Sequence, residues 1–126
     1  MKKEHRKDQR FPEMGRVEAS ELCALPGVVD DISLSGCRIH FPVPVTLDKD
    51  SEYMLKLKLF HLNAPSKLNL ICTPRWKTED SQKTQIGFKI LRSPDSPELA
   101  FYISQRTSEA EEQEASYSGY VNCSFA

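Results

Sequence analysis

Short runs in which apolar and polar residues alternate dominate the first ninety residues of the chain. The clearest run spans residues 53–60, where leucines at positions 55, 57 and 59 alternate with lysines at positions 56 and 58. A period of two places successive side chains on opposite faces, so this run predicts a half-buried β-strand. Related patterns predict five more strands, over residues 16–20, 27–32, 36–41, 68–75 and 85–91.

Six short strands with no helix between them favour a small closed antiparallel barrel. Closure removes exposed strand edges, and a chain of 126 residues is too short to fill a large sandwich. Prolines at positions 42, 44, 65 and 74 fall between the runs or at their ends, as strands require. The predicted fold is therefore mainly β, a six-stranded antiparallel β-barrel followed by a C-terminal α-helix.

The helix is predicted from a capping signal and an apolar stripe that follow the last strand. Asp95 or Ser96 can cap it, and Pro97 suits its first turn. We expect it to cover one opening of the barrel. Its stripe consists of Leu99, Tyr102, Ile103 and Arg106.

These patterns divide the chain into three parts. Residues 1–14 are polar and locally basic without an apolar face, which predicts a flexible arm. Residues 15–106 form the barrel with its closing helix. Residues 107–126 are acidic and then rich in Ser, Gly and Tyr, so we expect a poorly ordered tail.

Charge and cysteine usage narrow the functional classes. The formal net charge of -1 argues against a general nucleic-acid binder, which needs a basic excess to displace counterions. The four cysteines form no CxxC pair, and the chain opens without an apolar export segment. No run is long enough to span a membrane. We therefore expect a cytoplasmic protein without direct membrane insertion.

Metal and catalytic chemistry find little support in the spacing of the relevant residues. His5, His40 and His61 do not stand at ligand spacings from one another or from the cysteines. No cysteine is tied by the pattern to a histidine and an acid, as a nucleophilic enzyme would require. We predict no catalytic residues, no metal and no cofactor.

Two short motifs carry the binding chemistry. Arg6 and Arg10 stand in RKDQR, and Asp31, Ser33 and Gly36 stand in DISLSG. Arginine grips phosphate through paired hydrogen bonds or stacks on a base, whereas an ionised aspartate suits the donor edge of guanine. The hydroxyl of serine adds a donor or acceptor, and glycine permits close approach or a turn with positive φ. Together the motifs predict a site for a doubly charged nucleotide.

This pairing resembles the PilZ domain, the bacterial receptor module for cyclic di-GMP, with its RxxxR stretch followed by [D/N]xSxxG. Both halves are intact here, and the resemblance covers about residues 5–106. It implies a six-stranded barrel that binds cyclic di-GMP through Arg6, Arg10, Asp31, Ser33 and Gly36.

Three further residues are secondary candidates. His5 precedes the first motif arginine, at a position that the resemblance links to binding one nucleotide or a stacked pair, and the stoichiometry stays open. Lys7 lies between the motif arginines. Trp76 follows the strand predicted over residues 68–75, where relatives can place an aromatic residue beside the ligand; partly buried packing is the alternative that we favour.

The resulting hypothesis is a receptor that is not an enzyme. Cyclic di-GMP would draw the N-terminal arm against the barrel and alter the surface offered to an unidentified protein target, in a monomer or weak dimer. One alternative is a PilZ-like adaptor that binds a protein but no nucleotide. Another is a small barrel for single-stranded nucleic acid, for which Lys56 and Lys58 beside Met54 and Phe60 give a weak hint.

Overall fold

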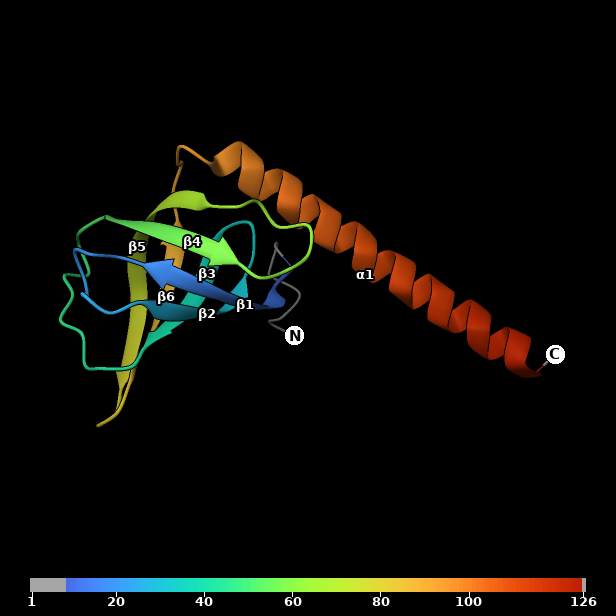
Figure 1. The fold of residues 1–126 in the computed structure, drawn as a ribbon, viewed down its shortest axis with the longest axis horizontal. Helices are drawn as coiled ribbons and strands as arrows, with labels where there is room; N and C mark the ends of the chain where they lie inside the picture. Colours follow the sequence, from blue (N-terminus) through green and yellow to red (C-terminus); the bar gives the residue numbers. More distant parts are fainter. Residues whose placement is uncertain (1–8, 126) are drawn as a thin grey trace.

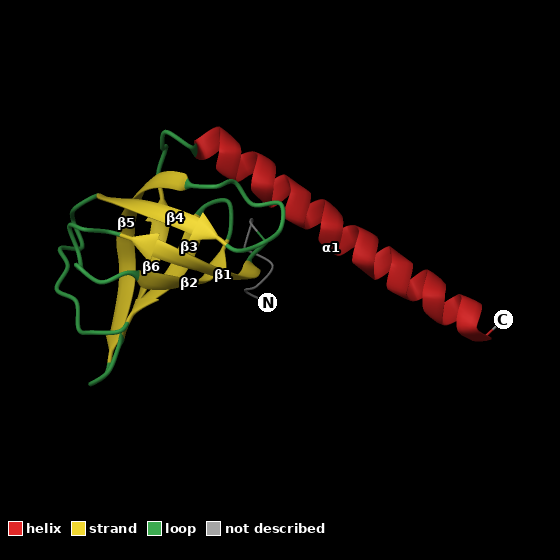
Figure 2. Cartoon of the chain, viewed as in Figure 1, coloured by secondary structure: helices red, strands yellow, loops and turns green. Residues whose placement is uncertain are grey.

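The structure, a computed structural model, describes residues 9–125 and, within them, the side chains of residues 9–112. Six strands precede one helix in this part of the chain (Figure 2). They are β1 (Phe11–Glu18), β2 (Gly27–Ile32), β3 (Gly36–Phe41), β4 (Tyr53–Leu59), β5 (Leu68–Glu79), β6 (Thr84–Ile90) and α1 (Ser96–Phe125).

Backbone hydrogen bonds close the strands into a barrel with the order β1-β2-β3-β6-β5-β4 (Figure 1). Every neighbouring pair is antiparallel. The predicted fold, a mainly β chain with a closed six-stranded barrel and a C-terminal helix, is confirmed. This order makes consecutive neighbours of β2, β3, β6 and β5. Residues far apart in sequence therefore share one outer surface.

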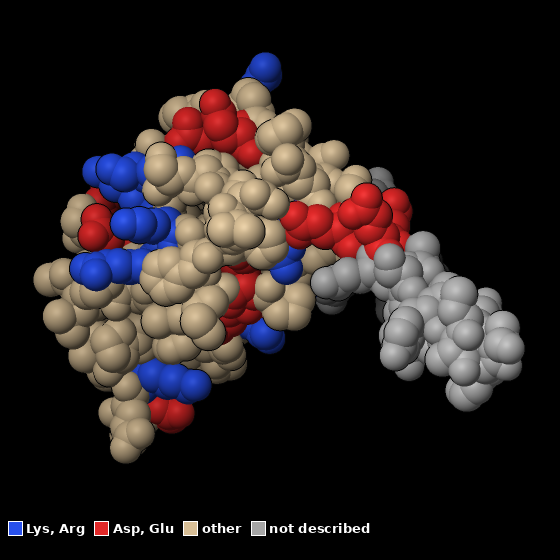
Figure 3. Space-filling model, turned by 45° about the vertical axis from the view of Figure 1, so that its right-hand side comes forward, with Lys and Arg blue, Asp and Glu red and all other residues tan. Residues whose placement is uncertain are grey.

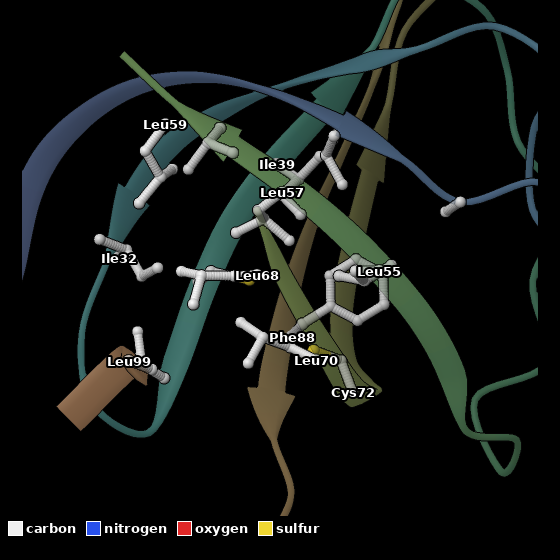
Figure 4. Close-up of a cluster of buried hydrophobic side chains, with 14 of the residues drawn as sticks. Ile32, Ile39, Leu55, Leu57, Leu59, Leu68, Leu70, Cys72, Phe88 and Leu99 are labelled. Carbon is white, nitrogen blue, oxygen red and sulfur yellow. The ribbon is translucent and has the colours of Figure 1, made fainter. Parts of the chain in front are cut away.

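The core lies inside the barrel and is built from the inward face of each strand. In β4 the leucines at positions 55 and 57 are fully buried and the lysines at positions 56 and 58 are exposed, as the alternation predicted. Figure 4 shows leucine, isoleucine and phenylalanine side chains from several strands converging there, with one leucine from the helix. The labelled side chains are Ile32, Ile39, Leu55, Leu57, Leu59, Leu68, Leu70, Cys72, Phe88 and Leu99.

The first strand begins earlier than the sequence pattern indicated. The sequence pattern placed residues 11–14 in the arm, but β1 starts at Phe11 and these residues are part of the barrel wall. The pairing of β1 with β2 shifts register between Pro12 and Gly15. This irregularity breaks the alternation of buried and exposed positions, which is why the pattern did not reveal the start of the strand.

β5 is longer than predicted, and it contains Pro74 in its interior. The pairing with β6 shifts register between Pro74 and Trp76, and such a bulge tolerates a residue that cannot donate a backbone hydrogen bond. Residues 75–79 are exposed and continue the strand through pairing with β6 alone. These residues place no side chain in the core, so they lack the alternation of buried and exposed positions from which the sequence predicts a strand.

α1 packs its predicted stripe on the barrel. Leu99 and Tyr102 are 2% and 1% exposed, and Ile103 is also buried in the core cluster. The Asp95 carboxylate accepts a hydrogen bond of 2.6 Å from the backbone N–H of Asn69, which ties the start of the helix to β5. The helix continues without a break through Phe125, and its second half extends past the barrel (Figure 1). That residues 107–126 are poorly ordered stays a prediction.

Within the described residues, no helix combines the length and the apolar character that crossing a bilayer requires.

The alternation in β4 can be tested through stability. Leu57 is fully buried in the core, so Leu57→Ala should lower the free energy of unfolding by about 2–5 kcal/mol through lost burial and a cavity. Lys56→Ala, on the outer face of the same strand, should change it by no more than about 0.5 kcal/mol. Urea unfolding followed by circular dichroism measures both. Similar losses for the two variants would contradict the assignment of faces.

Candidate functional site

The connection between β2 and β3 is a tight turn built by Ser33 and Gly36. The backbone N–H of Ser33 donates to the Gly36 carbonyl at 2.8 Å, and the N–H of Gly36 donates to the Ser33 hydroxyl at 3.1 Å. The hydroxyl in turn donates to the Gly36 carbonyl at 3.2 Å. Ser33 is 2% exposed. In this state its hydroxyl therefore shapes the turn and does not face solvent.

Gly36 lets the backbone of β6 approach the start of β3 closely. A Cβ at this position would lie 2.9 Å from the Phe88 carbonyl oxygen and 3.5 Å from a guanidinium nitrogen of Arg10. Among the described residues no glycine has a positive φ. Of the two roles that the sequence allowed for this glycine, close approach is therefore the one that the backbone supports.

Asp31 is held between two arginines. Its carboxylate accepts from Arg10 at 2.7 Å through Oδ1 and lies 2.9 Å from a guanidinium nitrogen of Arg38 through Oδ2. The Asp31 side chain is 12% exposed, whereas those of Arg10 and Arg38 are 37% and 44% exposed. The carboxylate is thus screened, and each arginine presents part of its surface to solvent.

Arg38 is a site residue that the sequence analysis missed. It lies on β3 directly opposite Asp31 on β2. Its Nε is buried and finds no hydrogen-bond partner among the residues that the structure describes. The alternation of β3 already placed Arg38 on the outer face, but its meeting with Asp31 depends on the register between the two strands. The register shift between Val29 and Asp31 lies beyond this pair, so the pairing follows once the turn that closes Ser33 on Gly36 is known.

Trp76 extends the same row across the barrel wall. The pairing runs from Asp31 to Arg38, from Arg38 to Gly87 on β6, and from Gly87 to Trp76 on β5. A Cβ on Gly87 would lie 2.2 Å from Nε1 of the indole, so the ring rests directly on the glycine backbone. Trp76 is nevertheless 44% exposed. The packing role that we favoured and an open aromatic surface coexist in this geometry.

A polar network lies beside this row on the same wall. His40 Nδ1 is 2.9 and 3.0 Å from the two carboxylate oxygens of Asp30, and the Gln85 amide donates to Asp30 at 3.1 Å. These three residues come from β3, β2 and β6. The sequence contained no sign of this cluster, because its members are 10 and 55 residues apart.

Three of the predicted site residues, His5, Arg6 and Lys7, lie outside the described residues. The structure brings Arg10, Asp31, Ser33 and Gly36 together at the start of β3, and Trp76 stands farther along the row. That these residues bind a ligand stays a prediction.

The exposed groups of this arrangement are suited to binding an anionic ligand. Cys37 lies next to Gly36 but is 1% exposed, and a hydrogen bond with Cys37, together with burial, raises the pKa of the Cys72 thiol. Among the described residues no group of three His, Cys, Asp or Glu side chains could hold a metal ion. What the row offers is two arginines, one carboxylate and an open indole, which match an anionic ligand with planar rings.

The lysines that hinted at nucleic acid form a separate surface. A cavity of about 290 Å³ on the outer face of β1 and β4 is lined by Arg16, Glu18, Lys56, Leu57, Lys58 and Lys67, none of them aromatic. Figure 3 shows basic side chains gathered on one side of the barrel and acidic ones near the point where α1 leaves it. Phe60, one residue after β4, is exposed but does not line this cavity, so the lysines and the aromatic ring that base stacking requires are not brought into one pocket.

Comparisons with known proteins identify the family. The model of the PilZ domain matches residues 4–104. No curated protein matches the sequence. Among solved structures, the inhibitor of motility MotI/DgrA from Bacillus subtilis has a TM-score of 0.65 at 14% identity, over 82% of this chain and 51% of that one.

Two other structures share the barrel. The MrkH–c-di-GMP complex of K. pneumonia has a TM-score of 0.65 at 16% identity, over 86% of this chain and 54% of that one. The PilZ domain of Escherichia coli YcgR with c-di-GMP has a TM-score of 0.59 at 15% identity, over 87% of this chain and 97% of that one. The chain thus spans about half the length of MotI/DgrA and MrkH, and at these identities the likeness concerns the fold. The family match over most of the sequence shows that the chain belongs to the PilZ domain family.

Proposed function

We propose that this chain is a receptor for cyclic di-GMP that binds the nucleotide on the β2-β3-β6-β5 wall. The observation that carries the proposal is the Asp31 carboxylate held between Arg10 and Arg38, in one row with the open indole of Trp76. Both halves of the RxxxR and DxSxxG pattern are present, and the family relatives MrkH and YcgR were solved with c-di-GMP.

Binding proceeds by exchange of partners. The phosphates of the nucleotide take the guanidinium groups of Arg10 and Arg6, and Arg10 then releases Oδ1 of Asp31. The freed oxygen accepts from the N1 and N2 hydrogens of a guanine, so the carboxylate loses one charged partner and gains another set of donors. The exchange leaves no charged group unpaired, which keeps its electrostatic cost small.

The energies suffice for a useful affinity. Hydrogen bonds to charged groups contribute about 1.5–3 kcal/mol each, and stacking of a base on an aromatic ring about 1–3 kcal/mol. A few such contacts, less the entropy of ordering the N-terminal arm, correspond to a dissociation constant of about 1 μM or tighter. Trp76 supplies one stacking surface, and an arginine plane supplies another.

The proposed receptor acts without catalysis. Ligand binding draws the N-terminal arm against the barrel and changes the surface presented to a protein target in the cytoplasm. Nothing in the described site supplies a nucleophile with a base, which is consistent with a signalling role. An adaptor that binds a protein but no nucleotide is the competing hypothesis, and it predicts no heat on titration with cyclic di-GMP.

The arginines give the first test. Replacing Arg6 or Arg10 with alanine should weaken cyclic di-GMP binding by at least about tenfold, because each loses a charge-assisted contact. Isothermal titration calorimetry measures the affinity and the stoichiometry. Arg16→Ala is the matched control, since Arg16 is exposed on β1 and its ion pair is a long one of 3.8 Å to Glu18. Absence of binding by the wild-type chain would overturn the proposal, and GTP serves as the ligand control.

The tryptophan gives a second, optical test. Trp76 is the one tryptophan of the chain, so its emission reports the site directly. Gly87→Ala should push the indole off the wall, shift its emission and weaken cyclic di-GMP binding by about fivefold or more, the loss of about 1 kcal/mol of stacking. Thr78→Ala, on the exposed end of β5, should change neither. Unaltered affinity in a Gly87→Ala protein with shifted emission would remove Trp76 from the site.

A further inference from the structure

A buried ion pair joins the start of β1 to the helix α1. The Glu13 side chain is 1% exposed, and its Oε1 accepts from Arg106 at 2.6 Å. Its Oε2 accepts from the Tyr102 hydroxyl at 2.8 Å. Both carboxylate oxygens are therefore bound by the helix, although Glu13 and Arg106 are 93 residues apart.

The same arginine holds the two residues that precede Glu13. The Arg106 guanidinium lies over the Phe11 ring at 5.0 Å and donates to the Pro12 carbonyl at 3.4 Å. Pro12 in turn stands opposite Asp31 in the pairing of β1 with β2. One helical residue thus contacts all three positions that connect Arg10 to the body of the barrel.

The charges of this cluster are mutually supporting. Burial by itself would lower the pKa of Arg106, but the hydrogen bond with Tyr102 and the attraction of Glu13 outweigh it and raise that pKa. Burial raises the pKa of Tyr102, so its hydroxyl stays protonated as a donor. Phe11 and Pro12 pair with Ile32 and Asp31 on β2, whereas Glu13 falls within the β1–β2 register shift between Pro12 and Gly15. The helix contacts therefore supplement strand pairing at this point.

We propose that Glu13, Tyr102 and Arg106 are positioning residues of the nucleotide site. By fixing residues 11–13, they hold the backbone of Arg10 at the site, where its side chain can pass from Asp31 to a phosphate, so α1 raises the affinity for cyclic di-GMP without touching it. This inference rests on the proposed function. The coupling is reciprocal: helix contacts that raise the affinity for the nucleotide are themselves strengthened when the nucleotide binds. The nucleotide then tightens the hold of the barrel on α1, whose second half extends past the barrel (Figure 1).

The test compares the contacts that α1 makes to Glu13 on β1 with the contacts that it makes, about one turn later, to the loop after β4. Arg106→Gln and Tyr102→Phe weaken the contact to Glu13, and each should weaken cyclic di-GMP binding by about fivefold or more, the lower range of coupling between sites. Glu109→Gln is the matched control. Glu109 contacts His61 at 3.3 Å and Asn63 at 3.1 Å, so it ties α1 to the loop after β4 and not to β1. Its affinity should stay within about twofold of wild type.

Calorimetry on the full chain measures the affinities, and hydrogen exchange measures the effect of nucleotide binding on α1. Cyclic di-GMP should slow exchange at the amides of residues 99–107 in the wild-type chain and not in Tyr102→Phe, which removes one oxygen and preserves the packing of the ring. A role confined to stability would lower the melting temperature of the variants and leave the affinity of the folded protein unchanged. That result, or an equal loss in Glu109→Gln, would overturn the inference while the wild-type chain still binds. No binding by the wild-type chain would overturn the proposed function as well.

Discussion

A carboxylate shared by two arginines is the interaction on which the candidate site depends. Asp31 joins Arg10 at the start of the chain to Arg38 on the neighbouring strand. An unpaired charge in this partly buried position would be costly, so the three groups hold one another in place until other charged partners replace them. A ligand with both phosphate and guanine can make that exchange in one step. A simple anion can replace the carboxylate but gives it no new donor.

Two glycines shape the surface around that interaction. Gly36 leaves space for the Phe88 carbonyl of β6 beside the turn, and Gly87 leaves space for the indole of Trp76 on the wall. In both cases the absent Cβ serves close packing of a neighbouring group, since neither glycine has a positive φ.

The first strand and the first part of the helix meet at the start of β1. The strand begins one residue after Arg10, and the helix α1 holds its first residues through Arg106. The helix α1 follows β6, is tied to the start of β5 through Asp95 and Asn69, and then crosses to the start of β1. This route lets a local change at the arginines reach a helix that extends beyond the barrel (Figure 1).

The sequence by itself determined the strands whose burial alternates, the apolar stripe of α1 and the two motifs, because each is a local pattern with a fixed period or spacing. It did not determine the start of β1, which a register shift conceals, or the exposed end of β5, which places no side chain in the core. Only the tertiary structure placed Arg38 opposite Asp31 and Arg106 against Glu13. Such pairs depend on strand register, barrel closure and helix docking, which bring residues together regardless of their separation along the chain.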